Sequence, residues 1–194
     1  MNLADVLIIG CSPRDGGNSD IAVHETARSA VSIGLSVEKL FLRDFRIIPC
    51  KGCRICAQSP DFRCVLSDLD QGRLILEKID LARVVCFCSP IFFYHLPAQF
   101  KALIDRSQSY YERWIATGNQ KADRKALCIL VAGRKKGDAL FRGSLLTLKY
   151  FLDPFNRKIS ELCLRGKDGR NDLKKDTAAR LQVSDFILRE LENS

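Results

Sequence analysis

The stretch ADVLIIGCSPRDGGNS, residues 4–19, begins with a continuous apolar run that ends at Gly10 and then passes through a glycine-rich loop. An uninterrupted apolar run of this length is typical of a strand buried on both faces of a sheet. Asn18 and Ser19 are good helix N-caps, and the residue spacing predicts a helix over 18–32 that stops at Gly34. A buried strand followed closely by a helix indicates a parallel α/β fold.

The same alternation continues along the chain. Four more apolar runs predict strands, and four more amphipathic stretches predict helices. The predicted strands are 35–42, 82–88, 125–133 and 158–166, and the predicted helices are 67–79, 97–114, 139–151 and 172–191. Five strands alternating with five helices predict an α/β doubly wound, five-stranded parallel sheet with helices on both faces. No repeat or linker divides it, so we expect a single domain over residues 1–194 with a cysteine-rich loop at about 49–66.

Composition indicates a cytoplasmic protein. A chain of 194 residues buries roughly 70% of its unfolded surface, so it needs no metal or disulfide to fold. No stretch approaches the roughly 20 apolar residues of a membrane span, and the first residues lack a signal-peptide pattern. Cytosolic thiols stay reduced, so the nine cysteines are not expected to form a disulfide framework. Cys86, Cys88 and Cys128 lie in apolar runs and are interpreted as small buried side chains.

The net charge of +8 is concentrated in one segment. Between Lys121 and Arg170 there are 13 Lys and Arg against 5 Asp and Glu, and the rest of the chain balances. Such a segment either attracts an acidic partner or a phosphate-bearing ligand, or is simply solvated surface. No aromatic-interleaved basic motif accompanies it, so nucleic acid is not expected as a partner.

Ligands of open α/β sheets bind beyond the carboxyl ends of the strands. The loop after the first strand combines flexible glycines, two hydroxyls and Arg14 with a following helix start, which predicts an anion-binding cradle. It lacks the G-x-G-x-x-G and G-x-x-x-x-G-K-[ST] patterns, so a phosphomonoester fits better than a dinucleotide or a nucleoside triphosphate. The loop after the third strand carries Phe92, Phe93 and Tyr94, which suit a flat ring. Phosphate and flat ring together suggest FMN.

Four cysteines crowd into fifteen positions with the spacing Cys50-x2-Cys53-x2-Cys56-x7-Cys64. Closely spaced thiolates of this kind can hold a 4Fe–4S cluster, which needs four cysteine ligands. Zinc is an alternative, although structural zinc sites more often use two separated C-x2-C pairs. A third alternative is that the loop holds no metal.

These motifs together resemble a known family. SPR-x-GGNS, the cysteine run, SP-[IV]-[YF]-F and AQFKALIDR, in this order, look like the flavodoxin-like NAD(P)H-dependent FMN reductases, and the cysteine spacing resembles their iron–sulfur flavoprotein branch. The resemblance implies strand order 2-1-3-4-5 and FMN as cofactor. By position it assigns the FMN phosphate to Ser12, Arg14, Asn18 and Ser19, and the flavin ring to Pro90, Ile91, Phe92, Phe93 and Gly133. The family often has a glycine pair at the last position, where this chain has GRKKGD.

The resemblance also implies a redox function. An acidic ferredoxin-like carrier would exchange electrons with FMN through the cluster, if Cys50, Cys53, Cys56 and Cys64 hold one. Without a cluster, the chain would be an NAD(P)H-dependent FMN or quinone reductase; a non-enzymatic flavin sensor or carrier is a third reading. The chemistry belongs to FMN, so no catalytic side chain is assigned, and His95 is a candidate hydrogen-bond partner of flavin or substrate. The family usually forms homodimers or homotetramers.

Overall fold

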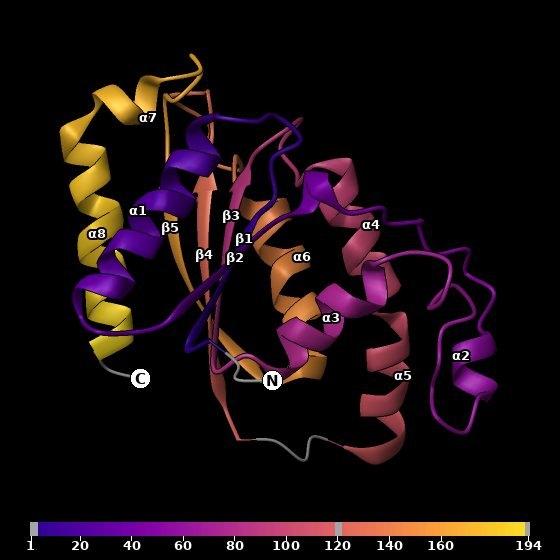
Figure 1. Cartoon of the computed structure of the whole chain (residues 1–194). Coiled ribbons are helices and arrows are strands. Elements are labelled where there is room, and N and C mark those ends of the chain that lie inside the picture. Colours follow the sequence, from indigo (N-terminus) through magenta and orange to yellow (C-terminus); the bar gives the residue numbers. More distant parts are fainter. Residues whose placement is uncertain (1–3, 119–121, 193–194) are drawn as a thin grey trace.

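The computed structural model describes residues 4–118 and 122–192. Its centre is a parallel sheet of five strands in the order β2-β1-β3-β4-β5, as Figure 1 shows. The strands are β1 (Val6–Gly10), β2 (Val37–Phe41), β3 (Val84–Pro90), β4 (Arg124–Val131) and β5 (Arg157–Leu164). The order and the parallel pairing confirm the predicted fold class.

Helices cover both faces of the sheet (Figure 1). One face carries α1 (Asn18–Ser32), α7 (Asp172–Lys175) and α8 (Thr177–Glu192). The other carries α3 (Gly72–Leu81), α4 (Ala98–Arg106), α5 (Gln108–Thr117) and α6 (Arg142–Leu152). The short α2 (Ile55–Gln58) lies outside these layers, in the cysteine-rich loop beside α5, and 3-10 turns form at Leu42–Asp44 and Asp153–Phe155.

The sheet is buried on both faces because its strands alternate between two apolar layers. Ile8, Cys86 and Ile129 pack with α1 and α8, whereas Ile9 and Phe87 pack with the helices of the opposite layer. Continuous apolar runs are therefore what the central strands require. The prediction that Cys86, Cys88 and Cys128 are small buried side chains is confirmed, since all three are 0% exposed.

Three of the predicted helices start later or are divided in the structure, in each case near a polar residue that bonds to the backbone. The helix predicted over 67–79 begins only at Gly72, because the carboxylate of Asp70 accepts the Gly72 N–H. The helix predicted over 97–114 divides at Ser107, whose hydroxyl donates to the Ile104 carbonyl. The last helix divides at Asp176, which accepts the N–H of Ala179 and so caps α8.

Within the described part of the chain, none of the helices is both long enough and apolar enough to cross a bilayer.

Candidate functional site

The β1–α1 loop, residues 11–17, has the backbone geometry of an anion site. Gly16 adopts a left-handed conformation with φ of 64°, and Gly17 is the extended N-cap of the fifteen-residue α1. The carboxylate of Asp20 accepts the Gly16 N–H at 2.8 Å. In the described structure, the next three amides of the loop and helix, at residues 17–19, have no hydrogen-bond acceptor. Unpaired amides at a helix start are a ready site for a phosphate.

Three arginines contribute guanidinium groups at this loop. Only one of them, Arg14, which is part of the loop, was identified from the sequence. Arg14 itself is exposed. Arg43 donates to the carboxylates of Asp20 and Asp15, at 3.0 and 2.9 Å. Arg170 donates to the Asp15 carbonyl at 3.0 Å, from a loop 155 residues away in the sequence. That separation is why sequence reasoning missed it.

Two of the predicted phosphate ligands use their side chains to shape the loop. The Ser12 hydroxyl donates to the Arg14 carbonyl and accepts the Arg14 N–H, both at 3.1 Å. The side-chain NH₂ of Asn18 donates to the carbonyls of Lys167 and Gly169, and its side-chain oxygen accepts the Leu173 N–H, all at 2.8–2.9 Å. Asn18 therefore joins α1 to the loop after β5. Ser19 is 2% exposed at the start of α1.

The aromatic loop, residues 91–97, closes a two-residue turn in an uncommon conformation. Phe92 and His95 exchange both backbone hydrogen bonds, at 2.8 and 2.9 Å. The two central residues, Phe93 and Tyr94, have φ of 49° and 64°, a region that bulky side chains rarely occupy. The Phe93 ring is fully exposed. Strain of this kind concentrates at ligand-binding segments.

The hydrogen bond from His95 to flavin or substrate stays a prediction, and in this structure both ring nitrogens contact protein groups. The Leu96 N–H donates to Nδ1 at 3.0 Å, so Nδ1 carries no proton. Nε2 then holds the proton and points to the Thr147 hydroxyl at 3.2 Å. Both ring nitrogens are used inside the protein, and the ring anchors the aromatic loop to α6.

The β4–α6 loop, residues 132–141, meets the aromatic loop and the loop after β5. The guanidinium of Arg134 lies 5.4 Å from the centre of the Tyr94 ring. A Cβ at Gly133 would come within 2.5 Å of Asp168 Oδ1. The glycine at 133 is thus explained by the close approach of the loop after β5, in addition to the flavin contact that the resemblance implies.

We expect Gly133→Ala to lower the free energy of unfolding by about 1 kcal/mol, because the new methyl group displaces Asp168. Denaturant unfolding of the two proteins measures the difference. In an Asp168→Ala background the cost should be smaller, because the carboxylate is gone and only the Cβ of residue 168, 3.2 Å from the new methyl group, still contacts it. An equal cost in both backgrounds would contradict the explanation.

The basic segment divides into a structural part and an exposed part. Arg157 is 5% exposed and donates to the carbonyls of Ile79, Ala82 and Lys125. Burial, with nearby Arg124, lowers its pKa to about 9. Five other cations form an exposed basic rim beside the aromatic and β1–α1 loops: Arg134, Lys135, Lys136, Arg165 and Arg170. Lys121 lies outside the described residues.

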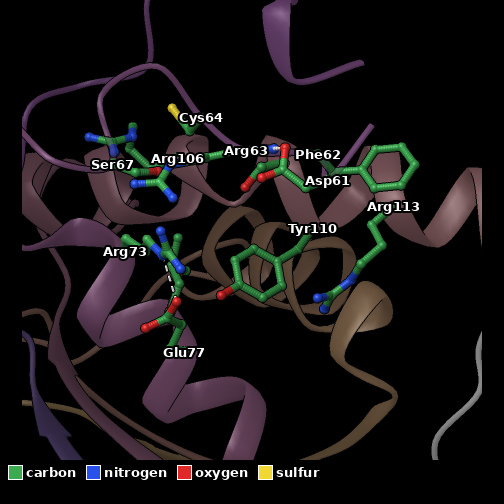
Figure 2. A pocket seen from close by; sticks show the side chains of 12 residues that line it. Asp61, Phe62, Arg63, Cys64, Ser67, Arg73, Glu77, Arg106, Tyr110 and Arg113 are labelled. Atoms are coloured by element: carbon green, nitrogen blue, oxygen red, sulfur yellow. Dashed lines mark hydrogen bonds and ion pairs between the residues drawn. The ribbon is translucent and has the colours of Figure 1, made fainter. Parts of the chain in front are cut away.

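The four crowded cysteines line one cavity of about 190 Å³, which we call the cysteine cavity. Burial, followed by the neighbouring Cys64 thiol, raises the pKa of Cys56. Across residues 4–118 and 122–192, no three His, Cys, Asp or Glu side chains are arranged around one point as ligands of a metal ion. A cluster, unlike a single ion, is held from its periphery, and four thiols around one cavity are the donor set it requires. Cys64 and Arg106, both labelled in Figure 2, also line the cysteine cavity.

A buried ion pair closes the base of this cysteine segment, residues 49–66. The carboxylate of Asp70 accepts from Arg106 at 2.5 Å and from the Ile48 N–H at 2.6 Å. Both side chains are at most 1% exposed. The pair fixes the chain immediately before and after the cysteines to the end of α4. Sequence reasoning missed it, because Asp70 and Arg106 lie 36 residues apart in the sequence.

The described cysteines form no disulfide. Cys11, Cys88 and Cys128 are fully buried, and burial raises the pKa of each thiol well above its usual value. These thiols are therefore poor nucleophiles and poor metal ligands. None of these three belongs to the four cysteines proposed from the sequence as metal ligands.

Comparison with known proteins gives three findings. The family model described as NADPH-dependent FMN reductase matches residues 4–167. Iron–sulfur flavoproteins from Methanocaldococcus jannaschii and Methanosarcina thermophila are 34% and 32% identical over 104 and 99 residues, 53% and 51% of this chain. These matches cover 51% and 50% of the relatives, so the chain spans about half the length of the curated relatives it matches.

The third finding concerns the fold. A solved structure described as the NAD(P)H:quinone oxidoreductase from Methanothermobacter marburgensis is similar, with a TM-score of 0.71 at 18% identity. The similarity covers 98% of this chain and 95% of that one. It shows that the fold is flavodoxin-like.

Proposed function

Since the chain belongs to the NADPH-dependent FMN reductase family, we propose that it is an FMN-dependent oxidoreductase that binds FMN at the carboxyl edge of its sheet. The observation that carries the proposal is the β1–α1 loop, where unpaired amides begin a long helix beside exposed Arg14. A phosphate matches these amides and the positive end of the helix dipole. The exposed aromatic loop then matches a planar ring.

In this proposal each predicted residue has a distinct part. Arg14 pairs with the phosphate, and residues 17–19 donate their amides to it, with the Ser19 hydroxyl beside them. Ser12 and Asn18 act mainly by holding the loop in shape. Pro90, Ile91, Phe92 and Phe93 line the ring, and Gly133 leaves room beside it.

Bound FMN supplies the hydride and electron chemistry, and the chain supplies binding, orientation and exclusion of water. The Phe92–His95 turn sets the position of the aromatic rings, and His95 fixes that turn to Thr147. Apolar side chains against one side of the flavin keep water from it. In this proposal the exposed basic rim attracts the negative charge of the electron donor.

The finer proposal is that Cys50, Cys53, Cys56 and Cys64 hold a 4Fe–4S cluster and that an acidic ferredoxin-like carrier is the partner. Its support is the similarity to proteins named iron–sulfur flavoprotein and the single cavity that the four thiols line. We also propose a homodimer or homotetramer. Leu146 and Tyr150, 56% and 64% exposed on α6, are apolar surface that a second copy can cover.

The second candidate is a cluster-free NAD(P)H-dependent FMN or quinone reductase. The exposed basic rim favours it, because such a rim also suits the phosphates of a nicotinamide nucleotide. Iron and sulfide analysis after anaerobic reconstitution separates the two candidates. Turnover assays with NADH, NADPH and reduced ferredoxin then identify the donor. A chain that binds FMN but turns over with none of them would favour the third reading, a flavin sensor or carrier.

We expect Arg14→Ala to weaken FMN binding by about tenfold or more, because one charge-assisted hydrogen bond to the phosphate is lost. Fluorescence titration of FMN into the apoprotein measures the affinity. Arg28→Ala, which removes an exposed arginine farther along α1, is the matched control and should leave the affinity unchanged. Unchanged affinity in Arg14→Ala would refute the phosphate assignment.

A further inference from the structure

A second cavity, distinct from the proposed FMN site, lies between the end of the cysteine segment, α3 and α5 (Figure 2). Its volume is about 140 Å³, enough for several waters or one small polyatomic ion. Four arginines line it, and we call it the arginine cavity: Arg63, Arg73, Arg106 and Arg113. Arg106 has a structural role in its pair with Asp70, but neither the fold nor the proposed FMN chemistry explains why three further arginines gather here.

Guanidinium groups outnumber carboxylates among the side chains that line the cavity, although each guanidinium also has a carboxylate partner. Against four guanidinium groups it has two carboxylates, those of Asp61 and Glu77. Three of the arginines pair with carboxylates outside the lining: Arg63 with Asp68, Arg106 with Asp70, and Arg113 with Asp80. Arg73 pairs through Nε with Glu77, as the dashed line in Figure 2 marks. A guanidinium has five N–H donors, and these pairings use only part of each.

Arg106 gives an independent indication of a missing acceptor. Its side chain is 1% exposed, and its Nε–H is buried with no hydrogen-bond partner in the described structure. Buried donors in native proteins are nearly always paired, with protein, water or an ion. Arg106 borders the arginine cavity and the cysteine cavity, so an acceptor held in either can complete its hydrogen bonds.

Hydroxyl groups complete the lining as further donors. Ser67, Ser109 and Tyr110 all border the cavity, and the Tyr110 ring reaches from α5 toward Arg73 in Figure 2. Burial, with the charges of Asp80 and Glu77, raises the pKa of Tyr110, so its hydroxyl keeps its proton. The side chains of Arg63, Arg73 and Arg113 are 42–45% exposed, which leaves a route from solvent.

We propose that the arginine cavity binds a small oxyanion, of the phosphate, sulfate or short carboxylate class. Guanidinium and hydroxyl donors are the groups that recognise such anions. The bound ion contacts the end of the cysteine segment, α3 and α5 together, and so fixes the segment in place. Cys64 and Arg106 line both this cavity and the cysteine cavity. Occupancy by the anion therefore restricts access to Cys64.

Binding is tested on the full chain, free of iron, with sodium phosphate, sulfate or succinate titrated against sodium chloride of equal ionic strength. We expect at least one oxyanion to raise the melting temperature saturably, and Arg73→Gln to weaken that effect by about tenfold. Lys101→Gln is the matched control, since Lys101 is equally exposed in an i,i+4 pair outside the cavity. A response no larger than that of chloride, or one equal in Arg73→Gln, would overturn the proposal.

Two further experiments test whether the anion binds in the arginine cavity. The response should persist in Arg14→Ala, which separates this cavity from the proposed FMN phosphate loop; its loss there would place the anion in that loop instead. The anion should also slow alkylation of Cys64 more than that of Cys53, which does not line the arginine cavity. If the anion slows alkylation of Cys64 and Cys53 by the same factor, the proposed location is refuted.

Discussion

The Asp70→Asn variant is expected to lose about 3–5 kcal/mol of unfolding free energy, the usual cost of leaving a buried charge without its partner. Asp70 and Arg106 pair at 2.5 Å with both side chains at most 1% exposed. The carboxylate oxygens also accept the N–H groups of Ile48 and Gly72. Asparagine replaces one acceptor by an NH₂ group, which then faces a donor. Urea unfolding of the purified chain measures the loss.

Asp68→Asn is the matched control. Asp68 also pairs with an arginine, Arg63, but its side chain is 75% exposed, so its removal should cost at most about 1 kcal/mol. Adding Arg106→Met to Asp70→Asn should recover part of the loss, because the unpaired charge is removed as well. A loss in Asp70→Asn no larger than in Asp68→Asn would show that the pair does not stabilise the fold.

The Asp70–Arg106 pair also makes the unfolding free energy depend on pH. Burial alone would raise the pKa of Asp70, but hydrogen bonds from Ile48, Arg106 and Gly72 lower it below the usual value. A carboxyl whose pKa is lower in the folded than in the unfolded chain contributes stability above the unfolded pKa of about 3.9. This contribution disappears as the pH falls through the lower, folded value. We therefore expect the stability of Asp70→Asn to fall less steeply below pH 4 than that of the wild type.

The fold was predictable because its signal is local. The apolar runs that became β1, β3 and β4 have no polar interruption, as strands covered on both faces require. Polar side chains with distant partners were not predictable. Asp70 has no local signal for its buried partner, and only the fold brings Arg106, 36 residues away, to it. The boundaries of a single domain over 1–194 stay a prediction.

In the candidate site, too, the local features were predictable and the long-range contacts were not. The glycines and Arg14 of the β1–α1 loop are adjacent in sequence, so the loop could be recognised. Arg170 and the Asn18 contacts join segments about 150 residues apart and leave no local pattern. The contact of His95 with Thr147 on α6 was not predictable for a similar reason, since 52 residues separate the two. The assignments of FMN ligands and cluster cysteines stay predictions.

The proposed cluster leads to the largest expected change in the iron content of the protein. After anaerobic reconstitution with iron and sulfide, the wild-type chain should retain about four of each per chain. Replacing Cys50, Cys53, Cys56 or Cys64 singly by serine should remove most of the iron, because a serine hydroxyl is a far weaker ligand for iron than a thiolate. Each of these thiols lines the cysteine cavity, so the loss should be similar for all four.

Cys163→Ser is the matched control for these four variants. Cys163 is half-buried on β5 and does not line the cysteine cavity, and burial raises its pKa to about 11, which disfavours the thiolate that iron requires. Its replacement should leave the iron content unchanged. Far-ultraviolet circular dichroism separates loss of ligand from loss of fold, since the segment lies outside the helical layers. A wild-type chain that keeps FMN but retains no iron would reject the cluster, and turnover with NADH or NADPH would then distinguish the cluster-free reductase from a flavin sensor or carrier.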